Sequence, residues 1–180
     1  MGVLTLYKNV FGLKLDRIEN NIIDICNLLN IDYSIVKLNI YFGEDAVSQI
    51  LQNTNLTKAQ AKKKRGMFLY LNKDGQVLEN PLVCIVNVNK GTLAHELCHY
   101  KQFIKKDKDL LDVNYILQNE CYYTYLKNYP YYSCEREAFN FALSYLSQNK
   151  EVFSNIRYLV YYLNYNFLKL DYYINKILKV

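Results

Sequence analysis

The chain has 180 residues, of which 51% are hydrophobic and 22% charged, and its formal net charge is +5. This composition indicates a globular protein with a sizeable core and excludes an intrinsically disordered chain. So mild a positive charge does not by itself indicate binding to nucleic acid or to an anionic membrane. We expect one domain over residues 1–180.

Two further classes are disfavoured by the sequence. Membrane proteins are disfavoured because no stretch reaches the roughly 18 uninterrupted apolar residues of a membrane span. Secreted proteins are disfavoured because the first residues lack the basic region and the long apolar run of a signal peptide. We therefore expect a cytoplasmic protein. The five cysteines, an odd number, include no C-x-x-C pair. Neither a zinc knuckle nor a disulfide framework is therefore indicated, and free thiols are expected.

The first half of the chain is predicted to contain helices and strands. Isoleucine and leucine recur with helical spacing over 15–30, which predicts an amphipathic helix. Residues 33–42 are rich in β-branched and aromatic side chains and are predicted to form a strand. Residues 44–60 are predicted to form a short helix and a loop.

A hairpin is predicted next. Residues 67–71 form its first strand, 72–75 the turn and 76–79 a short returning strand. Gly75 supplies the positive φ of the turn. Pro81 is expected to interrupt the returning strand, and 82–88 to form a separate buried strand.

The rest of the chain is predicted to be helical. A helix is expected from Thr92, its N-cap, to about Ile104, and a second over 110–127. Pro130 should break the chain and Ser133 should cap the next helix. The last helix, over 152–178, has a continuous apolar stripe. A helix, then strands, then helices indicate the α+β class.

The segment His95-Glu96-Leu97-Cys98-His99 is an H-E-x-x-H motif, and its histidines are the only two in the chain. Residues four apart lie on one face of a helix, so both imidazoles can bind one metal ion. The neighbouring carboxylate of Glu96 can then reach a water molecule on that metal. A pattern this short occurs by chance in on the order of one per cent of such chains. The motif lies on a predicted helix directly after a buried strand, and this position strengthens its interpretation as a metal site.

A catalytic zinc site requires a third protein ligand and leaves the fourth position to water. With no third histidine, this ligand must be a carboxylate, a thiolate or a group from a partner, and the H-E-x-x-H-x-x-G-x-x-H pattern is excluded. Glu135 shares its helix face with apolar side chains, where a carboxylate is costly unless it is paired or bound to metal. Glu137 shares a polar face. We predict Glu135 as the third ligand and Glu137 in solvent.

The motif H-E-L-C-H, followed on a later helix by E-x-x-A, resembles the gluzincin branch of the zincin metallopeptidases. The segment E-R-E-A-F-N-F-A is similar to the second motif of ImmA/IrrE-like peptidases of phages and mobile elements, and to the E-x-x-A-D of CAAX-type membrane peptidases. In those families the first glutamate of E-x-x-A binds zinc, which corresponds to Glu135. The resemblance covers roughly 82–146. It departs at Phe139, where an Asn or Asp usually orients a zinc-bound histidine; Asn140 could serve only if the helix turned differently.

The resemblance implies a zincin-like fold with a small mixed or antiparallel sheet packed on the H-E-x-x-H helix. The core would span 33–147, and the helix over 152–178 would pack against it. The implied activity is that of a zinc-dependent peptidase with one zinc ion per chain, held by His95, His99 and Glu135. Glu96 would act as general base towards the zinc-activated water and return the proton to the leaving amine.

The resemblance also implies an oxyanion-stabilising donor and a peptide or protein substrate. The candidate donors are Arg136 and three tyrosines, namely Tyr129, Tyr131 and Tyr132. In zincins the substrate adds as a strand to a sheet edge over the site, and the 67–79 hairpin is our candidate for that edge.

Simpler interpretations exist for each motif. The histidines could lie on an ordinary amphipathic helix, and Glu135 could be a first-turn helix charge or a partner of Arg136. A thiolate of Cys98 could bind zinc, although a small packed residue is the simpler interpretation, and Cys134 could act as a switch that caps the metal. An inactive zincin-fold binding module is the main alternative function.

Two surface features are also ambiguous. The basic run 62–65 fits a solvated loop, with nucleic-acid association as the alternative. The tyrosine-rich C-terminal segment fits helix packing, and a dimer interface is the alternative.

Overall fold

The computed structural model describes residues 4–7, 15–32, 36–87, 89–107, 110, 133–149 and 163. In chain order the described elements are β1 (Leu4–Tyr7), α1 (Leu15–Leu28), β2 (Leu38–Phe42), α2 (Gly43–Asn53), α3 (Lys58–Lys63), β3 (Gly66–Leu71), β4 (Val77–Ile85), α4 (Lys90–Ile104) and α7 (Ser133–Gln148). The helices predicted over 110–127 and 152–178 fall outside the described residues, except for Leu110 and Leu163.

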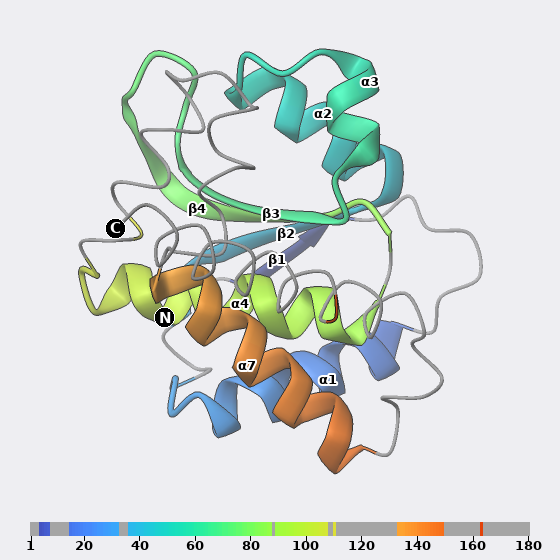
Figure 1. Cartoon of the computed structure of the whole chain (residues 1–180). Coiled ribbons are helices and arrows are strands. Elements are labelled where there is room, and N and C mark those ends of the chain that lie inside the picture. The colour runs from blue at the N-terminus through green and yellow to red at the C-terminus, as the bar shows by residue number, and fades with distance from the viewer. Residues whose placement is uncertain are drawn as a thin grey trace, which may run out of the picture.

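The described strands form a small mixed sheet in the order β1-β2-β4-β3. Strands β1, β2 and β4 are parallel, and β3 pairs antiparallel with β4 at one edge. Helices α2 and α3 lie on one side of this sheet, and α4, α1 and α7 lie on the other (Figure 1). A chain of helices around a small mixed sheet agrees with the predicted class at this coarse level.

Alternation along the strands divides the apolar side chains between the two faces of the sheet. On β4, Val83 and Ile85 belong to the core shared with α1, α4 and α7. The intervening Cys84 belongs to the smaller core under α2 and α3. Because both faces are covered, the centre of the sheet is apolar on both sides. None of the described helices is long and apolar enough to cross a membrane.

The hairpin was predicted correctly in outline but not at Pro81. Gly75 has φ +76°, and the Asn72 side chain accepts hydrogen bonds from the backbone N–H groups of Asp74 and Gln76. Strand β4, however, continues through Pro81 without a break. Pairing of β4 with β2 begins only at Leu82, so the proline lies where β3 is the only described neighbour of β4. A proline, which lacks the N–H group, is tolerated at such an edge position.

Other boundaries also differ from the predictions. Strand β1 was not predicted, because four residues are too few to establish a period. Strand β2 begins at Leu38. Helix α4 ends at Ile104 as predicted, but its N-cap is Asn89 rather than Thr92. The Asn89 side chain accepts hydrogen bonds from the N–H groups of Gly91 and Thr92, at 2.8 and 3.2 Å.

Helix α4 is the central helix of the structure. It lies between the sheet and α7 (Figure 1), and every residue from Gly91 to Tyr100 is buried. Helix α7 places small residues, Ala138 and Ala142, on its buried side, which allows close approach of the two helices. The polar groups of the H-E-x-x-H motif are therefore enclosed between α4, α7 and the sheet.

Candidate metal centre

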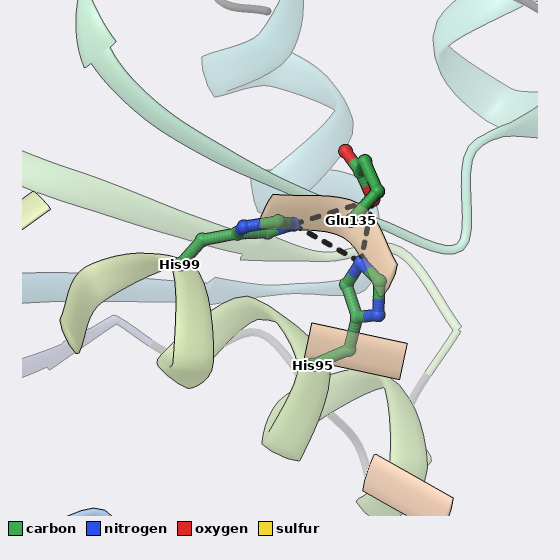
Figure 2. A group of neighbouring side chains, drawn as sticks. All are labelled: His95, His99 and Glu135. Atoms are coloured by element: carbon green, nitrogen blue, oxygen red, sulfur yellow. Dashed lines mark hydrogen bonds and ion pairs between the residues drawn. The ribbon is translucent and has the colours of Figure 1, made fainter. Parts of the chain in front are cut away.

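Three potential ligand atoms meet between α4 and α7. His95 and His99 lie one turn apart on α4, with their rings edge to face and 4.7 Å between centroids. Glu135, in the first turn of α7, points toward both rings (Figure 2). Its Oε2 lies 3.2 Å from His95 Nε2 and 3.5 Å from His99 Nε2, and the two Nε2 atoms are 3.1 Å apart.

These separations fit a single small cation. Two ligands at about 2.0–2.1 Å from a tetrahedral zinc ion are about 3.3–3.4 Å from each other. The observed values of 3.1, 3.2 and 3.5 Å bracket that separation. The predicted combination of His95, His99 and Glu135 is thus brought together, and this group could hold a metal ion.

The three groups are almost removed from solvent, with exposed side-chain fractions of 11% for His95 and 5% for His99 and Glu135. Burial alone would raise the pKa of Glu135, but the charge and hydrogen bonds of the two histidines outweigh it and hold that pKa well below its usual range. Burial would likewise lower the pKa of His99, yet Glu135 raises it to about 9. In the metal-free protein the carboxylate and an imidazolium therefore compensate each other's charge.

Gln102 determines which nitrogen of His99 faces the centre. Its side-chain Nε2 donates to the backbone oxygen of Cys134 and to Glu137 Oε2, both at 2.9 Å. These acceptors use both N–H groups, so Oε1 faces His99 Nδ1 at 2.7 Å. An amide oxygen can only accept, so Nδ1 carries the hydrogen. In the neutral ring the lone pair is therefore on Nε2, the atom that faces His95 and Glu135.

The residues near the E-x-x-A motif have roles that differ from the expectations. Phe139 is buried with its ring edge to face with His95, 6.0 Å between centroids, and Asn140 is exposed. Orientation of His99 comes from Gln102 instead. Glu137 is half exposed, as expected, but it also accepts the hydrogen bond from Gln102. Gln102 was not predicted as part of the site, although its position three residues after His99 on the same helix face could have indicated it.

Glu96 lies against the beginning of strand β3. A Cβ atom on Gly66 would be 2.6 Å from Glu96 Oε1 and 2.6 Å from Thr92 Cγ2, so only glycine fits there without a shift. Burial raises the pKa of Glu96, with Glu135 adding to the rise and the histidines opposing it. The carboxylate of Glu96 is thus a buried group between α4 and the edge strand of the described sheet.

Lys64, in the basic run 62–65, is a partly buried cation. It follows α3 and precedes β3, and it is only partly exposed, whereas Lys62 and Lys63 are exposed. Burial lowers the pKa of Lys64 to about 8, while the negative charges of Glu135 and Glu96 oppose that decrease. The basic run 62–65 was expected to be a solvated loop. Lys62 and Lys63 are exposed but form the last turn of α3, and Lys64 and Arg65 are only partly exposed.

The other candidates were oxyanion donors and cysteine ligands, and none of those that the structure describes lies in the ligand group of His95, His99 and Glu135. Arg136 is exposed on α7, and Tyr129, Tyr131 and Tyr132 lie outside the described residues. Cys98 is buried in the core as a small packed residue, and Cys134 is equally buried. Burial raises the pKa of the Cys98 thiol to about 12, so it is not a thiolate at neutral pH.

Comparisons with protein-family models, with curated proteins and with solved structures found no significant match to this chain.

Proposed function

We propose that this protein is a zinc-dependent peptidase of the zincin type. The observation that carries the proposal is the convergence of His95, His99 and Glu135, whose ligand atoms have the mutual spacing of a tetrahedral metal site inside a buried region. A structural ion pair would need only one histidine and one carboxylate. Two imidazoles from an H-E-x-x-H motif meeting one carboxylate are typical of catalytic zinc sites.

The donor set favours zinc among the common metals. Two imidazoles and one carboxylate suit zinc, whereas magnesium and calcium prefer sites made of oxygen atoms. The Gln102 contact supports this choice, because metal-binding histidines usually donate their other ring N–H to an oxygen. When bound, zinc would supply Lewis-acid polarisation of a carbonyl group and a lowered pKa for a water molecule.

Glu96 is the residue of this chain that would move the proton. Its burial raises its pKa, which brings the carboxylate closer to the neutral range where a general base is most effective. It follows His95 directly in the sequence. Glu96 would take the proton of the attacking water and return it to the amine when the C–N bond breaks.

The substrate class follows from the position of β3. This strand is at an edge of the described sheet, and its first residue, Gly66, touches Glu96. An extended peptide added to the edge of β3 that no described strand occupies would run past the proton-moving group. This supports a peptide substrate and the predicted role of the hairpin. The mixed α and β architecture, with the motif helix packed on the sheet, supports this proposal at the level of fold class.

The test measures metal and cleavage separately. Purified protein should contain one zinc ion per chain, His95→Ala should lose most of it, and Glu96→Gln should retain zinc while losing cleavage of a mixed peptide library. Glu79→Gln, an exposed carboxylate on β4, is the matched control and should behave as wild type. Absence of stoichiometric zinc from the wild type would refute the metal site.

Zinc without cleavage of any peptide would point to the alternative, a zincin-fold binding module. Phe139, which stands where an Asn or Asp usually orients a zinc-bound histidine, favours this alternative slightly, but Gln102 orients His99 here. Association with nucleic acid has less support, since Lys62 is paired with Glu44 at 2.9 Å and Lys64 is only partly exposed.

A further inference from the structure

The side-chain amide of Gln102 is almost completely enclosed, with 2% of the residue exposed. A buried amide is costly unless its polar atoms have hydrogen-bond partners. Its oxygen faces Nδ1 of His99 at 2.7 Å, and its nitrogen donates to the backbone oxygen of Cys134 and to Glu137 Oε2, both at 2.9 Å. The amide thus has one partner on α4 and two on α7.

The two partners on α7 lie on either side of Glu135 in the sequence. Cys134 precedes Glu135 directly, and Glu137 follows it by two positions. Residues three apart lie on the same side of a helix, so one amide nitrogen reaches both. We refer to these two hydrogen bonds from Gln102 to α7 as the amide bridge. Through its oxygen the same amide faces His99, so it contacts one ligand directly and also holds the turn that carries another.

Glu135 lies in a part of α7 that intrahelical hydrogen bonds hold incompletely. The helix begins at Ser133, and the first four N–H groups of a helix have no partner within it. The alanines on the buried side of α7, Ala138 and Ala142, lie further along the helix. Apolar contacts have no preferred direction, whereas hydrogen bonds require a defined distance and angle. The amide bridge therefore adds a directional restraint between the two helices at the level of Glu135.

We propose that Gln102 and Glu137 are positioning residues that hold Glu135 at ligand distance from the two histidines. This inference rests on the proposed function and goes beyond the orientation of the His99 ring, because it concerns the ligand on the other helix. His95 and His99 share α4, so their mutual distance does not depend on α7. The distances from Glu135 Oε2 to the two rings, 3.2 and 3.5 Å, do depend on it. Without the amide bridge the carboxylate is no longer fixed there, and the centre binds its metal less tightly.

The first experiment weakens the bridge on the α7 side and leaves the contact with His99 intact. Cobalt(II) is the probe, because the visible absorption of bound cobalt reports its affinity without any substrate. Glu137→Met and Glu137→Gln both lose the charge and the ion pair with Lys101 at 3.9 Å, but only the second can still accept from Gln102. Glu137→Met should therefore bind cobalt about 3- to 10-fold more weakly than Glu137→Gln. The difference is modest because Glu137 is half exposed and the bond to Cys134 remains.

The second experiment exchanges the two ends of the hydrogen bond. In Gln102→Glu the new carboxylate can still accept from Nδ1–H of His99, but it cannot donate to α7 and it faces the carboxylate of Glu137. Cobalt affinity should fall about 10- to 100-fold. In the double variant Gln102→Glu/Glu137→Gln the amide at position 137 donates to the carboxylate at position 102, and about 10-fold of the affinity should return. Charge alone predicts the reverse order, because the single variant carries one more negative charge and should attract the cation more strongly.

Asn140→Ala, an exposed substitution one turn further along α7, is the matched control and should leave cobalt affinity unchanged. Equal affinities of Glu137→Met and Glu137→Gln would overturn the inference and leave the metal site standing. The same holds if Gln102→Glu binds cobalt at least as tightly as the double variant. Failure of the wild type to bind cobalt would refute the proposed function, on which the inference rests. If Gln102→Glu does not fold, the comparison of the two substitutions at position 137 decides.

Discussion

Gln102 contributes to the stability of this protein and to its metal affinity. The substitution Gln102→Met tests both contributions, each by its own measurement. Methionine has a similar length but makes none of the three hydrogen bonds of the glutamine amide. The Nδ1–H of His99 would remain buried without that partner, whereas the backbone oxygen of Cys134 lies in the first turn of α7 and can still accept from the helix backbone. Each unsatisfied buried group costs about 1–3 kcal/mol. Glu137 is half exposed and can bond to water instead.

We therefore expect Gln102→Met to lower the free energy of unfolding of the metal-free protein by about 1–3 kcal/mol. Zinc affinity should also fall about 10- to 100-fold, because the ring of His99 is no longer held with Nε2 toward the centre. Urea unfolding in the presence of a chelator measures the first quantity. Competition with a chromophoric chelator measures the second.

Glu137→Gln is the control, because its amide oxygen can still accept from Gln102. Its free energy of unfolding should stay within about 0.5 kcal/mol of wild type, as for most surface substitutions. A folded Gln102→Met protein with wild-type zinc affinity would refute the reasoning, since the orientation of His99 would then not depend on the amide.

Three other predictions concern the surroundings of the centre. Gly66→Ala should destabilise the protein by about 1–3 kcal/mol, because the new Cβ displaces Glu96. The variant should retain zinc but cleave peptides more slowly. Urea unfolding, metal content and a cleavage assay measure these three effects. Asn89→Ala should cost about 0.5–2 kcal/mol of stability in urea unfolding through loss of the N-cap of α4, with zinc affinity nearly unchanged. Stability of the metal-free protein should fall as pH rises from 6.5 through about 9, because the raised pKa of His99 stabilises only while the ring is protonated. Zinc requires neutral imidazoles, so the increase in melting temperature that it causes should grow over the same range.

Each of these has an outcome that would contradict it. Full cleavage by Gly66→Ala would show that Glu96 is free to move or is not the base. Wild-type stability of Asn89→Ala would show that the cap contributes nothing. For the pH dependence the control is Glu135→Gln, which removes the carboxylate that raises the pKa of His99 and should flatten the profile. A metal-free stability that rises between pH 6.5 and 9 would contradict the assignment.

Much of the metal centre could be predicted from local sequence. The four-residue spacing of His95 and His99 places both on one face of any helix they form. Glu135 could be separated from Glu137 because only one of them shares a face with apolar residues, and burial of that face follows from helix periodicity. Asn89 was missed as the N-cap because Thr92 is a competing cap residue three positions later, and sequence does not tell which of two such residues begins the helix.

The partners of these residues depended on how distant segments pack together. Gln102 contacts residues more than 30 positions away only because α7 crosses α4 at this point. Lys64 is less exposed than Lys62 and Lys63 because it lies at the junction of α3 and β3, next to the point where Gly66 meets Glu96. Helical and strand periods determine which face a side chain occupies, and the sequence carries them. The neighbour that each face meets is determined by long-range packing, which no local pattern contains.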